Sequence, residues 1–234
     1  MRSFLITALC LCATLAAPEN PLFAQKPPDR WADAMRAFRE QDENSPFPPG
    51  NVVFVGSSSI RLWDLKKSFP EMEPTPLNRG FGGSEIADTN RHLDLLVLKH
   101  RPRLVVMYAG DNDIAAGRSP QRVHRDFEEF ARRVHAALPE TRIAYIAIKP
   151  SIARWKLAER MKEANALIAK SCEEDDRSTF VDIWAAMLGE EEKPRKQLLR
   201  DDGLHMTAAG YAVWVEALQG AMSTATPAAV NTAP

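Results

Sequence analysis

An aspartate and a histidine near the carboxyl end of the chain stand at a spacing that suits proton transfer. Asp202 and His205 lie in the segment "DDGLHMTAAGYAVW", just before a helical pattern. A carboxylate three residues before a histidine in one loop can accept a hydrogen bond from Nδ1–H, which leaves Nε2 free as a base. A serine hydroxyl near that nitrogen would become a nucleophile by losing its proton. The alternative is an Asp/Gly turn in which His205 only caps a helix.

Three further segments carry glycine and small polar residues directly after apolar runs. They are Gly56 to Ser59 ("GSSS"), Asn78 to Glu85 ("NRGFGGSE") and Gly110 to Asp113 ("GDND"). Each has a structural explanation when taken alone, because serine caps helices, glycine permits positive φ and Asp or Asn favours turns. A Ser/Gly turn can also bind phosphate through backbone N–H groups. The recurrence of this pattern after three successive strands nevertheless indicates one shared site.

The elements that would position these residues are short apolar segments alternating with amphipathic ones. The segments predicted to be strands are rich in Val and Ile with little polar alternation, which is typical of strands buried on both faces. They cover residues 51–56, 75–80, 103–110, 142–150 and 179–184. The segments predicted to be helices cover residues 28–41, 84–100, 119–139, 154–171 and 207–222.

This alternation predicts an α/β fold, namely a three-layer α/β/α sandwich with a central parallel five-stranded sheet of the flavodoxin-like type. In such sheets ligands bind at the carboxyl ends of the strands, in the loops that lead to the helices. The polar segments described above fall at that edge.

The amino terminus is predicted to be a signal peptide covering residues 1–24. Arg2 is followed by an apolar run from Phe4 to Ala17, and cleavage after Ala17 or Ala24 fits the small residues there. The run is too short for a spanning helix, and a buried amino-terminal helix is the alternative. Residues 28–221 are predicted to form one globular domain, and residues 222–234 a disordered tail. The mature protein is therefore expected to be secreted or periplasmic, without a stable membrane anchor.

The composition limits the classes of partner and of cofactor. The chain has 234 residues, 45% of them hydrophobic, and a net charge of −1, which suits one globular domain and does not predict a nucleic-acid partner. No histidine stands in a spacing typical of metal ligands, so no metal is expected. After signal cleavage Cys172 would be the one cysteine left, and its acidic surroundings favour a structural role.

Taken together, the four polar segments resemble the sequence blocks of the SGNH hydrolases, also called the GDSL esterase/lipase family. "GSSS", "NRGFGG", "GDND" and "DGLH" occur in the family's order between Gly56 and His205, which covers almost the whole expected domain. The resemblance implies the SGNH-hydrolase fold and a serine esterase that needs no cofactor. It also implies a small-molecule or glycan ester as the substrate.

The resemblance also assigns roles to individual residues. It implies that Ser58 is the nucleophile, His205 the base and Asp202 the acid that orients it. The oxyanion-hole donors implied are the backbone N–H groups of Ser58 and Gly83 and the side-chain amide of Asn112. The sequence departs from the family at two positions, since Ser57 stands where the family has aspartate and Ser59 where it has leucine, and this leaves open which of the three serines attacks. In the same way, Gly80 or Gly82 could take the role of Gly83, and Asp201 that of Asp202.

The function predicted is therefore hydrolysis of short-chain esters, acetyl esters on carbohydrates in particular, through a Ser-His-Asp triad and an acyl-enzyme. The alternatives are a lysophospholipase-type lipid esterase and a non-catalytic protein that binds phosphate or glycan on the same scaffold. Trp63 and Trp155 follow strand ends, where they could contact substrate or simply pack against the protein.

Overall fold

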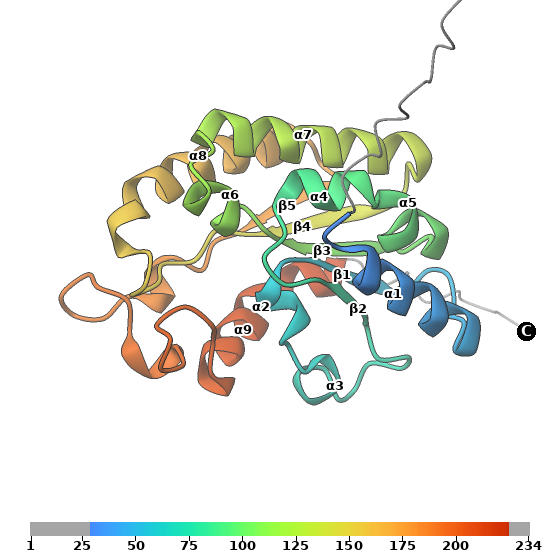
Figure 1. The fold of residues 1–234 in the computed structure, drawn as a ribbon, viewed down its shortest axis with the longest axis horizontal. Helices are drawn as coiled ribbons and strands as arrows, with labels where there is room; N and C mark the ends of the chain where they lie inside the picture. The colour runs from blue at the N-terminus through green and yellow to red at the C-terminus, as the bar shows by residue number, and fades with distance from the viewer. Residues whose placement is uncertain (1–28, 225–234) are drawn as a thin grey trace, which may run out of the picture. The chain divides into compact units, whose positions relative to one another are not determined.

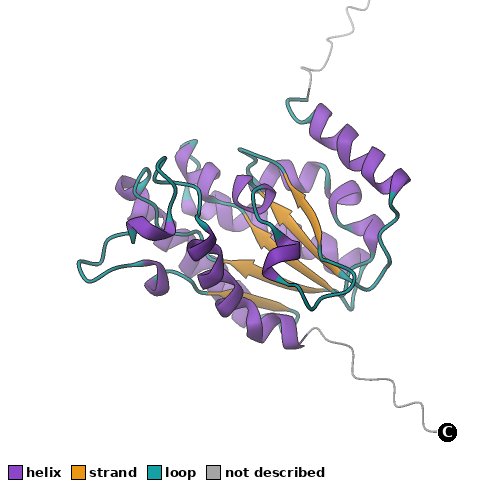
Figure 2. Cartoon of the chain, turned by 90° about the horizontal axis from the view of Figure 1, so that it is seen from below, coloured by secondary structure: helices purple, strands orange, loops and turns teal. Residues whose placement is uncertain are grey.

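The computed structural model describes residues 29–224 (Figure 1). The predicted signal peptide lies outside the described residues. The first helix, α1, spans Ala32–Asn44 and is followed by a sheet of five strands. These are β1 (Val52–Gly56), β2 (Leu77–Gly80), β3 (Leu104–Tyr108), β4 (Arg142–Ile146) and β5 (Ser178–Val181). All neighbouring strands are parallel (Figure 2), and their order is β2-β1-β3-β4-β5. The predicted five-stranded parallel sheet is confirmed.

Successive residues of each strand face opposite sides of the sheet, and both sides are buried. On β1, Val55 belongs to one core and Phe54 to the other, and on β3 Val105 and Val106 divide in the same way. The first core is covered by α7 (Pro120–Ala137) and α8 (Ala158–Glu173), and the second by α9 (Ala208–Thr224) (Figure 1). The three-layer α/β/α sandwich is therefore confirmed.

The longest helix shows how local sequence sets an element boundary. Ser119 caps α7 by accepting a hydrogen bond from the Arg122 N–H at 3.2 Å, and Pro120 occupies the first helical position. The apolar stripe of α7 is buried against the first core and consists of Val123, Phe127, Phe130 and Val134. Burial of this stripe, rather than helix propensity, supplies most of the stability of such a helix.

One predicted helix is broken in the structure. Instead of one helix over residues 84–100, the chain forms α4 (Ile86–Arg91), α5 (Leu93–Leu96) and a 3₁₀ turn at Leu98–His100. The backbone leaves helical geometry at His92. As a result α4 packs against α7 while α5 turns toward α1, and one straight helix could not make both contacts.

Several short elements were not predicted. They are α2 (Ser58–Arg61), α3 (Leu65–Ser68), α6 (Asp111–Ala115) and the 3₁₀ turns Ala185–Met187 and Lys196–Leu198. The helix predicted over residues 154–171 begins as a 3₁₀ turn, Trp155–Leu157, and continues as α8 from Ala158. Helix α9 continues to Thr224, so residues 222–224 are helical although they were assigned to the disordered tail. The rest of that tail lies outside the described residues. No helix within residues 29–224 has both the length and the apolarity needed to cross a membrane.

A buried group of charged side chains joins α1 to the edge strand β2. Arg79 is fully buried, forms an ion pair with Asp42 and lies over the ring of Phe38. Lys99 Nζ and His100 Nε2 lie 2.9 and 3.9 Å from Asp42 Oδ2. Burial, together with the positive charge of Arg79, lowers the pKa of His100 to about 4.

The depressed pKa of His100 predicts acid sensitivity of the fold. In the unfolded chain the His100 imidazole takes up a proton near pH 6.5, but in the folded chain only near pH 4. This histidine therefore does not destabilise the fold above pH 6.5, and it destabilises the fold increasingly as the pH falls from 6.5 to 4. The loss from pH 7 to pH 4.5 is about 2–3 kcal/mol. His100→Gln should remove most of this difference in urea unfolding, whereas His124→Gln, at the histidine of α7 whose Nε2 contacts Ser171 of α8, should not. An unchanged pH dependence in His100→Gln would contradict this explanation.

Candidate active site

Four loops meet at the carboxyl edge of the sheet. Strand β1 lies between β2 and β3, with Gly56 paired to Gly80 on one side and to Tyr108 on the other. The segments that follow these three strands are therefore neighbours, as the topology of parallel sheets predicts. Helix α9, which begins shortly after the loop that holds Asp202 and His205, joins them through Tyr211, whose hydroxyl donates to the Ser59 carbonyl at 2.8 Å.

Two glycines allow the first loop to pack this closely. A Cβ on Gly56 would lie 1.9 Å from the Tyr108 carbonyl oxygen, and the residue has φ of +135°. A Cβ on Gly80 would lie 2.2 Å from the backbone nitrogen of Arg61. Helix α2 therefore approaches β2 at a distance that only glycine permits at these positions.

Ser58, His205 and Asp202 form a continuous hydrogen-bonded chain. His205 Nε2 lies 2.9 Å from Ser58 Oγ, and His205 Nδ1 lies 2.6 Å from Asp202 Oδ2. The other carboxylate oxygen, Oδ1, accepts the backbone N–H groups of Leu204 and His205, each at 2.9 Å. In this arrangement Nδ1 donates to the carboxylate and Nε2 can accept the serine proton.

The carboxylate of Asp202 stays ionised because of these same hydrogen bonds. The bond with His205 and the one from the Leu204 N–H hold the pKa of Asp202 well below its ordinary value. The side chains of Asp202 and His205 are 48% and 25% exposed, so solvent and a ligand can reach this end of the chain of hydrogen bonds.

The three adjacent serines occupy different environments. Ser58 is half-buried at the first position of α2, whereas Ser57 and Ser59 are each only 2% exposed. The backbone of Ser57 donates to Tyr108 O at 3.0 Å, and its carbonyl accepts from Ile60 at 3.1 Å, so it sets the turn that starts α2. Of the three hydroxyls, only that of Ser58 contacts the histidine among the described residues.

The other predicted residues lie at the neighbouring strand ends. Gly83 has φ of +78°, and its N–H donates to no acceptor within residues 29–224. Asn112, at the start of α6, donates Nδ2–H to the Ser84 carbonyl at 3.0 Å, beside Gly83. The Ser58 N–H has no acceptor one turn earlier in its helix. These three groups are donors free to bind an oxygen that develops negative charge.

Asp113, next to Asn112, joins two loops of the site and was not predicted from the sequence to do so. Asp113 is fully buried and accepts the backbone N–H groups of Ile86 at 3.0 Å and Gly110 at 3.1 Å, which ties the loop after β2 to the loop after β3. Burial raises the pKa of Asp113 to about 7. Its place in "GDND" was visible in the sequence, where it was interpreted only as a turn residue.

A buried group of charged side chains behind Asn112 was also missed. Asp111 contacts Lys149 Nζ at 3.1 Å, the hydroxyl of Tyr108 at 3.3 Å and the guanidinium of Arg154. Burial acts to raise the pKa of Asp111, but the charges of Lys149 and Arg154 hold it below its usual value. A lysine inside the apolar run "YIAIKP" was the signal in the sequence that could have indicated a buried ion pair.

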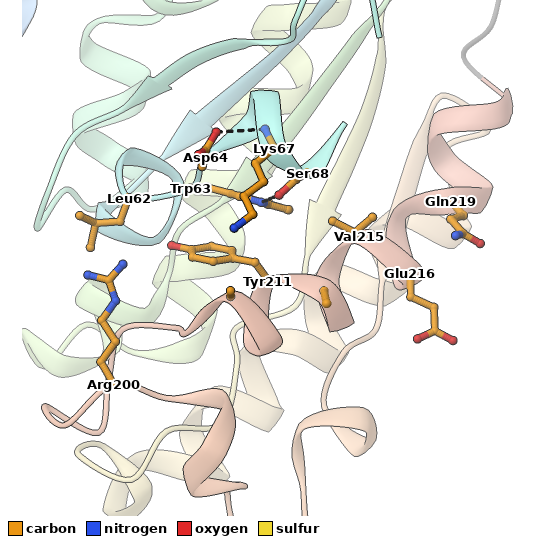
Figure 3. Close-up of a pocket in the computed structure, with 12 residues that line it drawn as sticks. Leu62, Trp63, Asp64, Lys67, Ser68, Arg200, Tyr211, Val215, Glu216 and Gln219 are labelled. Atoms are coloured by element: carbon orange, nitrogen blue, oxygen red, sulfur yellow. Dashed lines mark hydrogen bonds between the residues drawn. The ribbon is translucent and has the colours of Figure 1, made fainter. Parts of the chain in front are cut away.

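A pocket of about 690 Å³ lies beside this site, between the segment that follows α2 and the outer face of α9. Figure 3 shows Leu62 and Arg200 at one end and Glu216 and Gln219 at the other, with Tyr211 between them. The Arg200 N–H donates to the His205 carbonyl at 2.7 Å, so the pocket adjoins the histidine loop. Ser58, Asp202 and His205 do not line it.

Trp63, Trp155 and Cys172 are all packed against neighbouring side chains, and Trp63 also lines this pocket. Trp63 is 3% exposed, stacks on Tyr211 at 5.1 Å and donates to Ser68 Oγ at 2.8 Å. Trp155 is half-buried and stacks on Trp184 at 6.4 Å. Cys172 is buried, and burial raises the pKa of its thiol to about 12, which makes the thiolate scarce at neutral pH. No group of three or more potential metal ligands occurs within the part of the chain described.

Solved structures with the same fold include several esterases and lipases. A Streptococcus pneumoniae protein given the provisional name platelet activating factor is 21% identical, with a TM-score of 0.73 over 82% of this chain and 92% of its own. A GDSL-like lipase from Bacteroides thetaiotaomicron is 19% identical, with a TM-score of 0.67 over 82% and 98%. An acetyl-xylooligosaccharide esterase from Geobacillus stearothermophilus is 14% identical, with a TM-score of 0.60 over 74% and 93%. No curated protein sequence matches this chain.

The family match rests on the sequence itself. Residues 65–213 match the GDSL-like Lipase/Acylhydrolase family, which is more than half of the chain. The matched region contains Gly83, Asn112, Asp202 and His205 and begins after Ser58, so the position of Ser58 rests on the geometry described above. The protein belongs to the GDSL-like lipase/acylhydrolase family and has the SGNH-hydrolase fold.

Proposed function

We propose that this protein is an exported serine esterase that removes short acyl groups, acetyl in particular, from carbohydrate esters. The observation that carries the catalytic part is the chain of hydrogen bonds from Ser58 Oγ through His205 to Asp202, at 2.9 and 2.6 Å. A binding protein for phosphate or glycan has no use for such a chain, because it serves to remove a proton from the serine.

In the acylation half-reaction, Ser58 Oγ attacks the ester carbonyl carbon while its proton passes to His205 Nε2. The carbonyl oxygen becomes an oxyanion, bound by the N–H groups of Ser58 and Gly83 and by Asn112 Nδ2–H. The bond to the alcohol oxygen then breaks, and the imidazolium gives its proton to that oxygen. Asp202 stabilises the imidazolium throughout and stays ionised.

In the deacylation half-reaction, water takes the place of the alcohol. His205 Nε2 removes a proton from the water as it attacks the acyl carbon, and the same oxyanion donors act again. The bond to Ser58 Oγ breaks, the proton returns to the serine, and the carboxylic acid leaves. Each half-reaction uses His205 first as base and then as acid, so one histidine suffices.

Two observations support the acyl group and the alcohol we propose. The same fold carries an acetyl-xylooligosaccharide esterase in the Geobacillus protein. The half-exposed Asp202 and the exposed Arg200 and Asp201 before it leave the site open to a bulky polar alcohol such as a sugar. A lysophospholipase-type esterase is the alternative, and the acyl-chain profile separates the two.

Export is supported by the amino-terminal sequence. Arg2, the apolar run to Ala17 and the small residues up to Ala24 have the order of a secretory signal peptide. Expression of the full chain in a bacterial host, with mass spectrometry of the periplasmic and cytoplasmic fractions, should give a mature chain that begins after Ala24 or Ala17. An unprocessed chain confined to the cytoplasm would contradict export.

The test of the activity is the hydrolysis of p-nitrophenyl esters with two to twelve acyl carbons, alongside acetylated xylooligosaccharides and lysophosphatidylcholine. We expect the highest kcat/KM for the acetyl ester and release of acetate from the oligosaccharide. A maximum at long chains with turnover of the lysophospholipid would favour the lipid esterase. A folded protein that turns over none of these would contradict the esterase proposal.

A further inference from the structure

The carboxylate of Asp111 is held by two cations, although one would neutralise it. Lys149 is fully buried, and its Nζ contacts Asp111 Oδ2 at 3.1 Å and the Tyr108 hydroxyl at 3.2 Å. The guanidinium of Arg154 contacts the other oxygen, Oδ1. The side chain of Asp111 is 6% exposed and that of Arg154 is 20% exposed.

The surplus cation is Arg154. A buried lysine needs an anion, because an unpaired charge in the interior is strongly unfavourable, and Asp111 is the carboxylate that Lys149 contacts. The pair of Asp111 and Lys149 is therefore balanced without the arginine. Arg154 comes from the loop between β4 and α8 and reaches the solvent edge of this pair, so pairing of Asp111 does not by itself account for it.

The second amino group of Arg154 contacts Asn112. Its N–H donates to Asn112 Oδ1 at 3.1 Å, while Asn112 Nδ2 donates to the Ser84 carbonyl at 3.0 Å. A guanidinium can only donate and a carbonyl can only accept, so the two contacts together exclude the flipped amide. Asn112 Nδ2 carries two hydrogens, and the second one has no acceptor within the described residues.

We propose that Arg154 is a positioning residue that fixes the side-chain amide of Asn112 so that Nδ2–H faces the oxyanion. This inference rests on the proposed function, since it assigns a task to Arg154 only if Asn112 is an oxyanion donor. Anchored on Asp111, the guanidinium holds Oδ1 away from the site. A flipped amide would present its carbonyl oxygen to the oxyanion and would repel it.

The planar fork of arginine suits this task better than a lysine would. One nitrogen contacts Asp111 and another contacts Asn112, which fixes two neighbouring residues at the start of α6 relative to each other. Lysine carries the same charge as a single point and cannot occupy both acceptors in this geometry. The comparison of Arg154→Lys with Arg154→Ala therefore separates geometry from charge.

The experiment measures kcat and KM for p-nitrophenyl acetate in wild type, Arg154→Ala, Arg154→Lys, Asn112→Ala and the double variant Asn112→Ala/Arg154→Ala. Arg154→Ala should lower kcat by about 10- to 100-fold with little change in KM, because a misplaced donor is lost mainly in the transition state. Arg154→Lys should lower kcat nearly as much. In the Asn112→Ala background, removal of Arg154 should have no further effect on kcat.

The matched control is Arg160→Ala. Arg160 also anchors the segment after α6, donating to the carbonyls of Gly117 and Arg118, but it does not contact Asn112. It should retain wild-type kcat. Thermal melting of every variant checks the fold, which Arg154→Ala should keep because Asp111 retains Lys149.

Three results would overturn the inference. They are an unchanged kcat in Arg154→Ala, full activity in Arg154→Lys, and losses that multiply in the double variant, since the last would mean that Arg154 acts independently of Asn112. A second measurement does not depend on turnover. The side-chain amide of Asn112 in a ¹⁵N spectrum, assigned by its loss in Asn112→Ala, should exchange with water several times faster in Arg154→Ala than in wild type. Unchanged exchange would refute the positioning role, whereas an inactive wild type with changed exchange would refute only the esterase proposal.

Discussion

Replacing Ser58 with alanine is expected to lower kcat for p-nitrophenyl acetate by about 10⁵-fold or more, since removal of the nucleophile leaves only the oxyanion donors and binding. The physical reason is that Ser58 Oγ lies 2.9 Å from His205 Nε2, and no other hydroxyl within residues 29–224 contacts that nitrogen. Steady-state kinetics with freshly purified protein measures the loss. His205→Ala, assayed at the same pH, gives the background rate.

The neighbouring serines provide matched controls. Ser57→Ala and Ser59→Ala remove one hydroxyl each from a buried position, while the hydrogen bonds given above for these residues use their backbone atoms. Both variants should therefore keep most of the wild-type kcat. A fluorophosphonate should add once to wild type and to these controls, as seen by intact mass, and should not add to Ser58→Ala. Labelling of Ser57 or Ser59 would contradict the assignment of Ser58.

The second large effect is expected for Asp202→Asn, which should lower kcat by about 10³- to 10⁴-fold. The asparagine keeps Oδ1, so the backbone N–H groups of Leu204 and His205 retain their acceptor and the turn is preserved. The new amide instead donates to His205 Nδ1, which moves the ring proton to Nε2. The nitrogen that faces Ser58 is then a donor and cannot take the serine proton. The lower end of the range allows for the 48% exposure of Asp202, which lets water compete for Nδ1.

Asp201 is the matched control for this change, because it is the exposed carboxylate next in sequence. Asp201→Asn makes the same change of charge one residue away and should leave kcat near that of wild type. Comparable kcat values in Asp202→Asn and wild type, or a larger loss in Asp201→Asn, would show that the orienting carboxylate has been assigned incorrectly. Both variants should melt within a few degrees of wild type, because each position is exposed.

The strand-and-helix order of the domain was predictable because it depends on local patterns. Strands buried on both faces must be apolar throughout, and a helix covering one face must repeat its apolar residues every three to four positions, as α7 does with Val123, Phe127 and Phe130. The edge of the sheet that carries the site also followed, since parallel strands bring their carboxyl ends together. The order of Gly56, Gly83, Asn112 and His205 along the chain could therefore be interpreted as one site.

By itself, then, the sequence determined the fold class, the family and a short set of candidates: three serines, two aspartates, three glycines, one asparagine and one histidine. Only the tertiary structure distinguished among the serines, because burial of Ser57 and Ser59 and the 2.9 Å contact between Ser58 and His205 depend on packing between residues far apart in the chain. It also decided the contacts of Lys149 and Arg154 with Asp111. Such pairs leave no periodic pattern in a sequence, since their partners are chosen by distance and charge in the folded protein.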